Sequence, residues 1–207
     1  MAIRSDNPPF LYSRQTIAQN FTMSHVKLQC LLTLICLLAV IPTRADQTDP
    51  QLDALFDALT DTEDSRLLSE IESRIWNLWY QHSDRDMQAA LVAGDRLMNA
   101  GYHGDALRVF TAVIDQQPAY AEAWNRRATL HYLMGNFAES VSDIDQTLKL
   151  EPRHFGALSG LGLVYLQQNN LLKAREAFES LLSIHPNSQA ARQNLESVLE
   201  ALRTQFI

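Results

Sequence analysis

Few side chains in this sequence have the types and spacing that catalysis or metal binding requires. The nearest approach to a cluster is His82, Asp84 and Asp86, which alternate along a short polar segment. Imidazole and carboxylate groups can bind a divalent metal ion, and a bound ion can activate water for hydrolysis. Polar segments of this kind are more often simply solvated, so a metal-dependent enzyme built on this loop is the alternative interpretation.

The other reactive residue types do not converge on one place. The histidines after residue 45 lack paired spacing, which indicates surface or packing roles. They are His82, His103, His131, His154 and His185. Both cysteines, Cys30 and Cys36, come before residue 46, and the sequence has no HExxH, GxSxG or phosphate-binding glycine motif. We therefore expect no catalytic residue, no metal ligand and no cofactor.

Residues 1–45 have the features of a secretory signal. From Met23, basic Lys27 is followed by a largely apolar run over residues 30–41, then Pro42 and small Ala45. As a helix this run would span about 18 Å, short of a hydrocarbon core of about 30 Å. We expect cleavage after Ala45 and a periplasmic or secreted product. An uncleaved membrane anchor stays open, as does a true start at Met23 instead of Met1.

The chain after Ala45 is acidic. Four of the 17 Lys and Arg residues and one of the 24 Asp and Glu residues precede residue 46, which leaves 13 basic and 23 acidic residues and a net charge of −10. Such a chain cannot neutralise phosphates, so nucleic acid and anionic membrane surfaces are poor partners.

A 34-residue period organises the remaining sequence. Aligning residues 87–120, 121–154 and 155–188 places a proline, two small residues, one large apolar residue and one turn residue in common columns. The columns are Pro118, Pro152 and Pro186; Gly94, Ala128 and Gly162; Ala106, Ser140 and Ala174; Phe110, Ile144 and Phe178; and Gly101, Gly135 and Asn169.

These columns predict two helices in each repeat. The small residues allow the helices to approach closely, and the large apolar residue fills the space between them. Glycine and asparagine adopt the left-handed conformation that ends the first helix, and proline closes the second.

The columns resemble the tetratricopeptide repeat, most clearly through Trp124, Gly135 and Pro152 in the middle repeat and Tyr165 and Phe178 in the last. The segment from 152 to 162 is also similar to small exported bacterial repeat proteins. Arg127 and His131 stand where the family prefers leucine and tyrosine. The resemblance implies an all-α fold, a right-handed α-solenoid of antiparallel helix pairs.

Both ends of the predicted solenoid carry further helices. Apolar residues at helical spacing predict a pair of helices over 46–86, which lacks the glycine and proline columns and is interpreted as a degenerate amino-terminal cap or extension. Residues 189–207 predict one amphipathic capping helix. Asp143 and Asp145 are two residues apart on one helix and indicate a charged outer surface.

In tetratricopeptide proteins the first helices of successive repeats line a concave groove, and the resemblance implies the same use of matching positions here. They are Leu91, Asp95, Asn99, Asn125, Arg126, Thr129, Ser159, Leu163 and Gln167. Arg126 offers a fork for a carboxylate, while Asn125 and Gln167 can bond a peptide backbone. Alternatively, Asn125 and Arg126 pair with Glu122 or Asp95.

The resemblance therefore implies a non-catalytic scaffold or adaptor that holds a peptide or helix of another protein. The subgroup that clamps a chaperone's terminal carboxylates has lysine, asparagine and basic residues where this chain has Leu91, Asp95, Gly156 and Gly160, so that motif is not expected as the ligand. A third interpretation is self-association through Trp76, Trp79 and Tyr80, should these aromatics be exposed.

Overall fold

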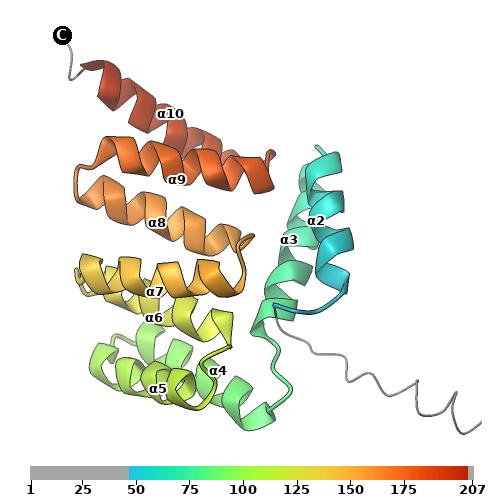
Figure 1. Cartoon of the computed structure of the whole chain (residues 1–207), viewed down its shortest axis with the longest axis vertical. Coiled ribbons are helices and arrows are strands. Elements are labelled where there is room, and N and C mark those ends of the chain that lie inside the picture. Colours follow the sequence, from blue (N-terminus) through green and yellow to red (C-terminus); the bar gives the residue numbers. More distant parts are fainter. Residues whose placement is uncertain (1–46, 205–207) are drawn as a thin grey trace, which may run out of the picture. The chain divides into compact units, whose positions relative to one another are not determined.

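The computed structural model describes residues 47–204, in which every regular element is a helix (Figure 1). The predicted leader over 1–45 and the last residues of the predicted capping helix, 205–207, lie outside the described residues. Within them the helices are α2 (Gln51–Asp61), α3 (Ser65–Tyr80), α4 (Arg85–Asn99), α5 (His103–Gln116), α6 (Ala121–Leu133), α7 (Phe137–Leu150), α8 (Phe155–Gln167), α9 (Leu171–Ile184) and α10 (Gln189–Thr204). The all-α prediction is confirmed.

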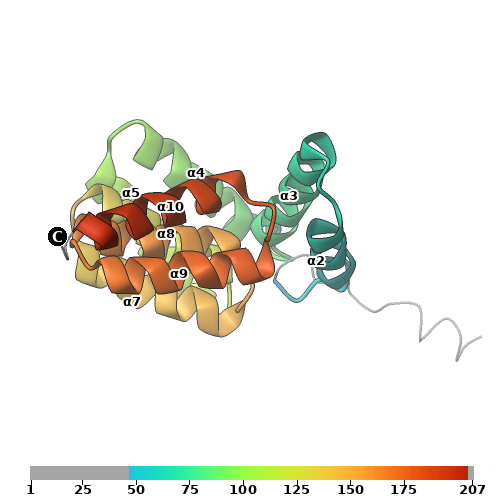
Figure 2. The ribbon, with the colours of Figure 1, turned by 90° about the horizontal axis from the view of Figure 1, so that it is seen from above.

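Helices α4 to α10 form one stack of antiparallel neighbours. The pairs α4–α5, α6–α7 and α8–α9 each pack closely, successive pairs contact through α5–α6 and α7–α8, and α10 packs on α9 (Figures 1 and 2). The stack is the predicted α-solenoid, because each hairpin packs against the next one along the line.

Close approach within the pairs depends on the small-residue column. A Cβ atom at Gly94 would overlap the Phe110 ring, and one at Gly162 would overlap the Phe178 ring. Both phenylalanines are fully buried. In the middle pair the small residue Ser140 donates its hydroxyl to the Ala128 carbonyl oxygen, 2.9 Å away. The columns therefore perform the small-to-large packing that the repeat predicts.

The turn inside each pair uses the predicted left-handed residue. Gly101, Gly135 and Asn169 have φ values of 81°, 77° and 54°. The next residue of each turn donates its N–H to a carbonyl five residues back, as in Asn136 N–H to His131 O at 2.9 Å. This pattern caps the carboxyl end of the first helix.

The amino-terminal pair α2–α3 does not cap the first repeat, contrary to our interpretation. It lies beside the repeats, and α3 contacts α6 (Figure 1). Apolar residues of both helices share a buried cluster with Phe155, Leu158, Leu181 and Ala191 of α8, α9 and α10. The sequence showed that the pair is amphipathic but not which surface its apolar face would cover.

The loops between repeats hold this pair by a recurring set of polar contacts. Tyr120 donates its hydroxyl to the Tyr80 carbonyl at 2.7 Å. Arg153 Nη1 lies 2.8 Å from Asp53 Oδ1, and Asn187 Nδ2 donates to the Thr62 carbonyl at 2.7 Å. Each contact comes from a different junction of the repeat, so the 34-residue period of the sequence also spaces the anchors along one edge of the stack.

The packing of the glycine column yields a test in which one substitution has opposite effects at two positions. Gly162→Ala should destabilise the fold by about 1–3 kcal/mol, because the new methyl group meets the Phe178 ring, which packs among buried Leu171, Ala174 and Val198. Gly104→Ala on α5 meets no atom within 4 Å and should be neutral or slightly stabilising. Urea unfolding followed by circular dichroism measures both, and equal midpoints would contradict the packing role of Gly162.

Candidate functional site

A pocket of about 350 Å³ opens between α6, α7, α8 and the side of α3. Its wall is mainly small and apolar. The lining residues are Trp76, Asn125, Arg126, Ala128, Thr129, Tyr132, Leu133, Ser140, Ile144, Gly156, Ser159, Gly160 and Leu163. Five of the nine residues predicted for the groove therefore meet in one place: Asn125, Arg126, Thr129, Ser159 and Leu163.

The other predicted groove residues are placed differently. Leu91 is completely buried in the core with Phe110 and Leu130, so the prediction that it contacts a partner is wrong. Asp95 lies beside Arg126, with 3.9 Å between Oδ1 and Nε. Asn99 and Gln167 are exposed, and Gln167 Nε2 is 3.4 Å from the Tyr132 hydroxyl. Leu91 points inward because it shares a helix face with buried Gly94 and Met98.

A fully buried carboxylate, Glu122, lies behind the pocket wall. Its Oε1 accepts from Arg126 Nε at 2.6 Å, while Oε2 accepts from Asn125 Nδ2 at 3.0 Å. Oε2 is also 3.0 Å from His154 Nε2. His154 Nδ1 accepts the N–H of Ala157, so the proton of the neutral ring is on Nε2 and is donated to Glu122. The pairing of Asn125 and Arg126 with Glu122 that we held as an alternative is the observed arrangement.

Helix α3 closes one side of this network with aromatic rings. Trp79 stacks on His154 with ring centroids 4.0 Å apart and an interplanar angle of 13°. The Arg126 guanidinium lies over the rings of Trp76 and Tyr80, 5.5 and 4.7 Å from their centroids. Trp79 is only 1% exposed, and Trp76 and Tyr80 are half-buried. Self-association through freely exposed aromatics is therefore wrong as an interpretation of these residues.

The surroundings of the pocket shift the pKa values of the two acids in opposite directions. Burial would raise the pKa of Glu122, but Arg126 and the His154 hydrogen bond outweigh it and lower that pKa below the ordinary value. Burial raises the pKa of Asp95 from 3.8 to about 6, with attraction to Arg126 opposing it and repulsion from Glu122 adding to it. Asp95 Oδ1 is buried and has no hydrogen-bond partner. Glu122 is therefore the satisfied carboxylate, while the charge of Asp95 is poorly compensated.

Arg127 stands where the tetratricopeptide repeat prefers leucine, and its contacts explain the difference. Its guanidinium makes two 2.8 Å hydrogen bonds to the carboxylate of Asp143, one from Nε and one from Nη2, and a 3.1 Å bond to Thr111 Oγ1. Asp143 is 4% exposed, so its assignment to a charged outer surface is wrong, whereas Asp145 is exposed. The ion pair joins α6 to α7 in place of an apolar contact.

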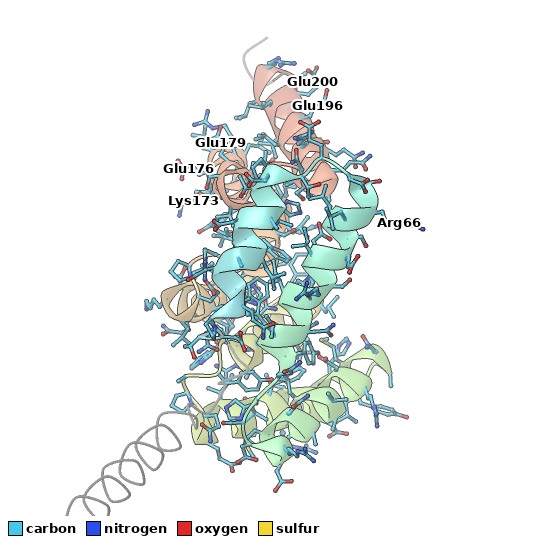
Figure 3. The ribbon with its side chains drawn as sticks, turned by 90° about the vertical axis from the view of Figure 1, so that its right-hand side faces the viewer. Arg66, Lys173, Glu176, Glu179, Glu196 and Glu200 are labelled. Carbon is cyan, nitrogen blue, oxygen red and sulfur yellow. The ribbon has the colours of Figure 1, made fainter. Side chains whose placement is uncertain are left out.

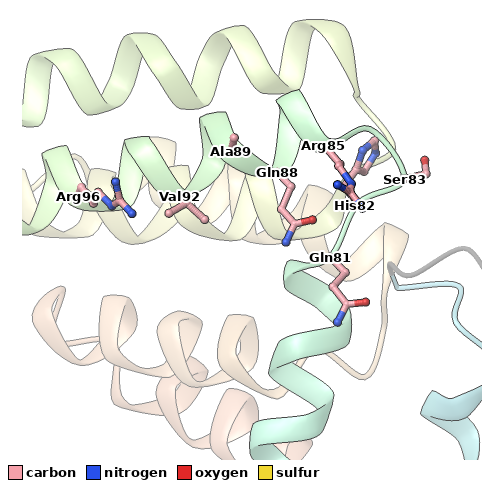
Figure 4. Close-up of a pocket in the computed structure, with 8 residues that line it drawn as sticks. All are labelled: Gln81, His82, Ser83, Arg85, Gln88, Ala89, Val92 and Arg96. Atoms are coloured by element: carbon pink, nitrogen blue, oxygen red, sulfur yellow. The ribbon is translucent and has the colours of Figure 1, made fainter.

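The loop with His82, Asp84 and Asp86 serves to start α4. The Asp84 carboxylate accepts the N–H groups of Asp86 and Met87, as an N-cap does, and His82 Nδ1 accepts the Asp84 N–H. The His82 ring packs on Tyr120, with centroids 4.6 Å apart. A shallow pocket next to this loop is lined by residues of α4 such as Arg85 and Arg96 (Figure 4). Nowhere in residues 47–204 do three His, Cys, Asp or Glu side chains come together as a metal site.

A second pocket lies on the other side of Trp76, and the two pockets together form a trough along α3. The second pocket lies between α3, α8 and α10, and it shares Trp76, Gly156 and Ser159 with the first pocket. A Cβ atom at Gly156 would collide with the Trp76 indole. The sequence analysis missed this role of Trp76; the glycine at 156, at a groove position of the third repeat, is the signal that could have pointed to a close neighbour.

Charged side chains of the outer surface gather at the carboxyl-terminal end of the stack. Figure 3 shows Glu176 and Glu179 on α9 with Glu196 and Glu200 on α10, and Lys173 nearby. Between residues 47 and 204, no helix combines the length and the apolar character needed to cross a membrane.

The geometry defines this chain as a helical-repeat protein with a lateral groove, and comparison with known proteins gives the family. The tetratricopeptide repeat model matches residues 91–143 and 128–191. A TPR repeat-containing protein of Rhizobium etli is 33% identical over 165 residues, which cover 79% of this chain and 81% of that protein. The chain belongs to the tetratricopeptide repeat family.

More distant proteins match a smaller share of this chain. DnaJ homolog subfamily C member 3 of Rattus norvegicus is 28% identical over 116 residues, 56% of this chain and 23% of that protein. The first TPR of Spaghetti (RPAP3), bound to an HSP90 peptide, has a TM-score of 0.55 at 22% identity, covering 57% of this chain and 94% of its own. A crystal structure of MamA protein has a TM-score of 0.52 at 20% identity, covering 70% and 81%. These structures establish the likeness of fold.

The state of Asp95 predicts how stability depends on pH. Because folding raises its pKa from 3.8 to about 6, ionised Asp95 destabilises the folded protein; the penalty is complete above pH 6 and disappears below 3.8. Asp95→Asn should therefore stabilise the protein by about 1 kcal/mol at about pH 8, after allowance for solvent screening, and the gain should shrink as the pH falls toward 4.

Asp145→Asn is the matched control, because it removes the same charge from an exposed position on α7. Chemical denaturation of the three proteins between about pH 4 and 8 measures the effect. A gain for Asp95→Asn that is equal at both ends of this range, or a loss at high pH, would contradict the assigned state.

Proposed function

We propose that this protein is a non-catalytic interaction module that holds a segment of a partner protein in the trough beside α3. The observation that carries the proposal is the pocket of about 350 Å³ whose wall combines α6, α7, α8 and Trp76. Structural neighbours support it by fold: the Spaghetti domain is bound to an HSP90 peptide, and another TPR domain was solved in an Hsp70 complex.

The shape of the trough favours an anchored segment. Ala128, Ile144 and Leu163 present apolar surface, while Gly156 and Gly160 keep the wall low. The volume is near the lower end of the roughly 300–1,000 Å³ usual for ligand pockets, so it suits one large side chain with its adjacent backbone. Thr129 and Ser159 also line the pocket, where their hydroxyl groups can form hydrogen bonds with that backbone.

The setting we propose is the bacterial cell envelope. It rests on the basic, apolar and small-residue order of residues 23–45 and on the similarity to a bacterial relative over most of the chain. An acidic chain without cysteine after residue 45 suits an exported scaffold whose compartment can be oxidising or reducing.

Export can be tested by mass. Expressed in a bacterium, the full chain should be recovered outside the cytoplasm with an amino terminus at Asp46. Replacing Ala45 by a bulky residue, Ala45→Trp, should retain the leader, because signal peptidase requires a small residue there. Intact-mass measurement of fractionated cells reads both results, and an unprocessed cytoplasmic wild type would refute the envelope setting.

Partner binding can be tested by changing the pocket floor. Leu163→Glu should reduce the capture of partner proteins by chemical crosslinking at least about tenfold, because it places a charge on the apolar wall. Leu172→Glu is the control: Leu172 is 56% exposed at the start of α9 and does not line the pocket. Equal capture by both variants, each with wild-type circular dichroism, would refute the groove as the binding site.

A further inference from the structure

Acidic groups lie near both ends of the trough, which the sequence did not predict. Three charged groups lie together next to the first pocket, where α4 faces α6: Asp95, Glu122 and Arg126, of which Arg126 lines the pocket. Two are carboxylates and one is a guanidinium, so the group carries a net negative charge when both acids are ionised.

Arg126 is already engaged with the protein itself. Its Nε donates to Glu122 at 2.6 Å, and its guanidinium plane lies over Trp76 and Tyr80. Its side chain is 22% exposed. Removing Arg126 from Glu122 to serve a partner carboxylate would leave a buried acid without its cation, which is strongly unfavourable. The expected fork for a carboxylate stays a prediction for the two Nη groups, since Nε is committed to Glu122.

Asp95 is the less well compensated of the two acids. The 3.9 Å separation from Arg126 Nε is too long for a hydrogen bond, and Oδ1 is buried without one. The side chain is nevertheless 17% exposed. A cationic group arriving from outside would compensate the charge of this carboxylate.

The far side of the trough is also acidic. Glu72 of α3 lines the second pocket, and its side chain is 38% exposed while Oε1 is 2.6 Å from buried His185 Nε2. Apart from His185, Glu72 is the one titratable residue of that lining. A segment that runs across Trp76 from one pocket to the other thus has a carboxylate near each end of its path.

We propose that the partner segment is basic: one large apolar side chain enters the pocket at Leu163 and Ile144, and a lysine or arginine within a few residues of it pairs with Asp95. This inference rests on the proposed function, because it describes the ligand of the same trough. The ligand chemistry is the reverse of an acidic carboxyl-terminal motif, because the cation is supplied by the partner and the carboxylate by this chain.

Selection from a phage-displayed library of random twelve-residue peptides tests the proposal on the full chain. We expect enriched peptides to share an apolar residue with Lys or Arg close to it. The same selection on Asp95→Asn should keep the apolar preference and lose the basic one. Asp145→Asn, which removes an equal charge from exposed α7, should leave both preferences unchanged.

The affinities of one enriched peptide, made by synthesis, and of its Lys-to-Ser and Lys-to-Glu versions then measure how much the lysine contributes to binding. The lysine should improve binding to the wild type by about fivefold over serine, as expected for a partly exposed ion pair, and by under about twofold for Asp95→Asn.

The possible outcomes distinguish a failure of the basic partner from a failure of groove binding itself. Enrichment of apolar peptides without basic residues, or of acidic ones, overturns the basic partner and leaves groove binding standing. A basic preference that survives Asp95→Asn overturns the role of Asp95. If Leu163→Glu removes none of the enrichment, groove binding and the inference are refuted together.

Discussion

The structure depends on keeping one buried carboxylate satisfied. Glu122 is fully excluded from water, and burying its ionised carboxylate without hydrogen-bond donors would cost more free energy than the fold could tolerate. Its donors are Asn125 and Arg126 from its own helix and His154 from the start of α8. The network therefore fixes the register of two neighbouring repeats, and it uses the side chains that would otherwise be free to read a peptide.

The same network recruits the amino-terminal helices. Trp79 stacks on His154, and Trp76 and Tyr80 lie against Arg126, so α3 shields the polar cluster from solvent. The aromatic group continues to Phe155, which is 4.9 Å from Trp79 between ring centroids. Because these rings are packed in the shared apolar cluster, α3 is a fixed wall of the trough. Helix α3 therefore lines one side of the groove through Trp76, and Asp95 is the nearby carboxylate whose buried oxygen has no hydrogen bond.

Stability and recognition are linked at that acid. Asp95 carries a cost in the folded protein that a binding partner could relieve, in keeping with the general tendency of functional sites to retain poorly satisfied groups. Glu122 is the opposite case, because its environment favours the charged form. Two carboxylates near one arginine thus have different roles: Glu122 holds the repeats together, while Asp95 is the group left for a ligand.

The sequence by itself determined the repeat. A 34-residue period, glycine or asparagine at each left-handed turn, and a small residue opposite each large one are local requirements of helix pairing, and they predicted the stack. Five of the pocket residues were implied only by the resemblance to the tetratricopeptide repeat. The tertiary structure alone decided where α2–α3 packs, that Leu91 and Asp143 are buried, and that Arg126 faces inward to Glu122. Helical periodicity identifies an apolar face but not the surface that covers it. Residues as distant in sequence as Trp79 and His154 become neighbours only when the chain folds.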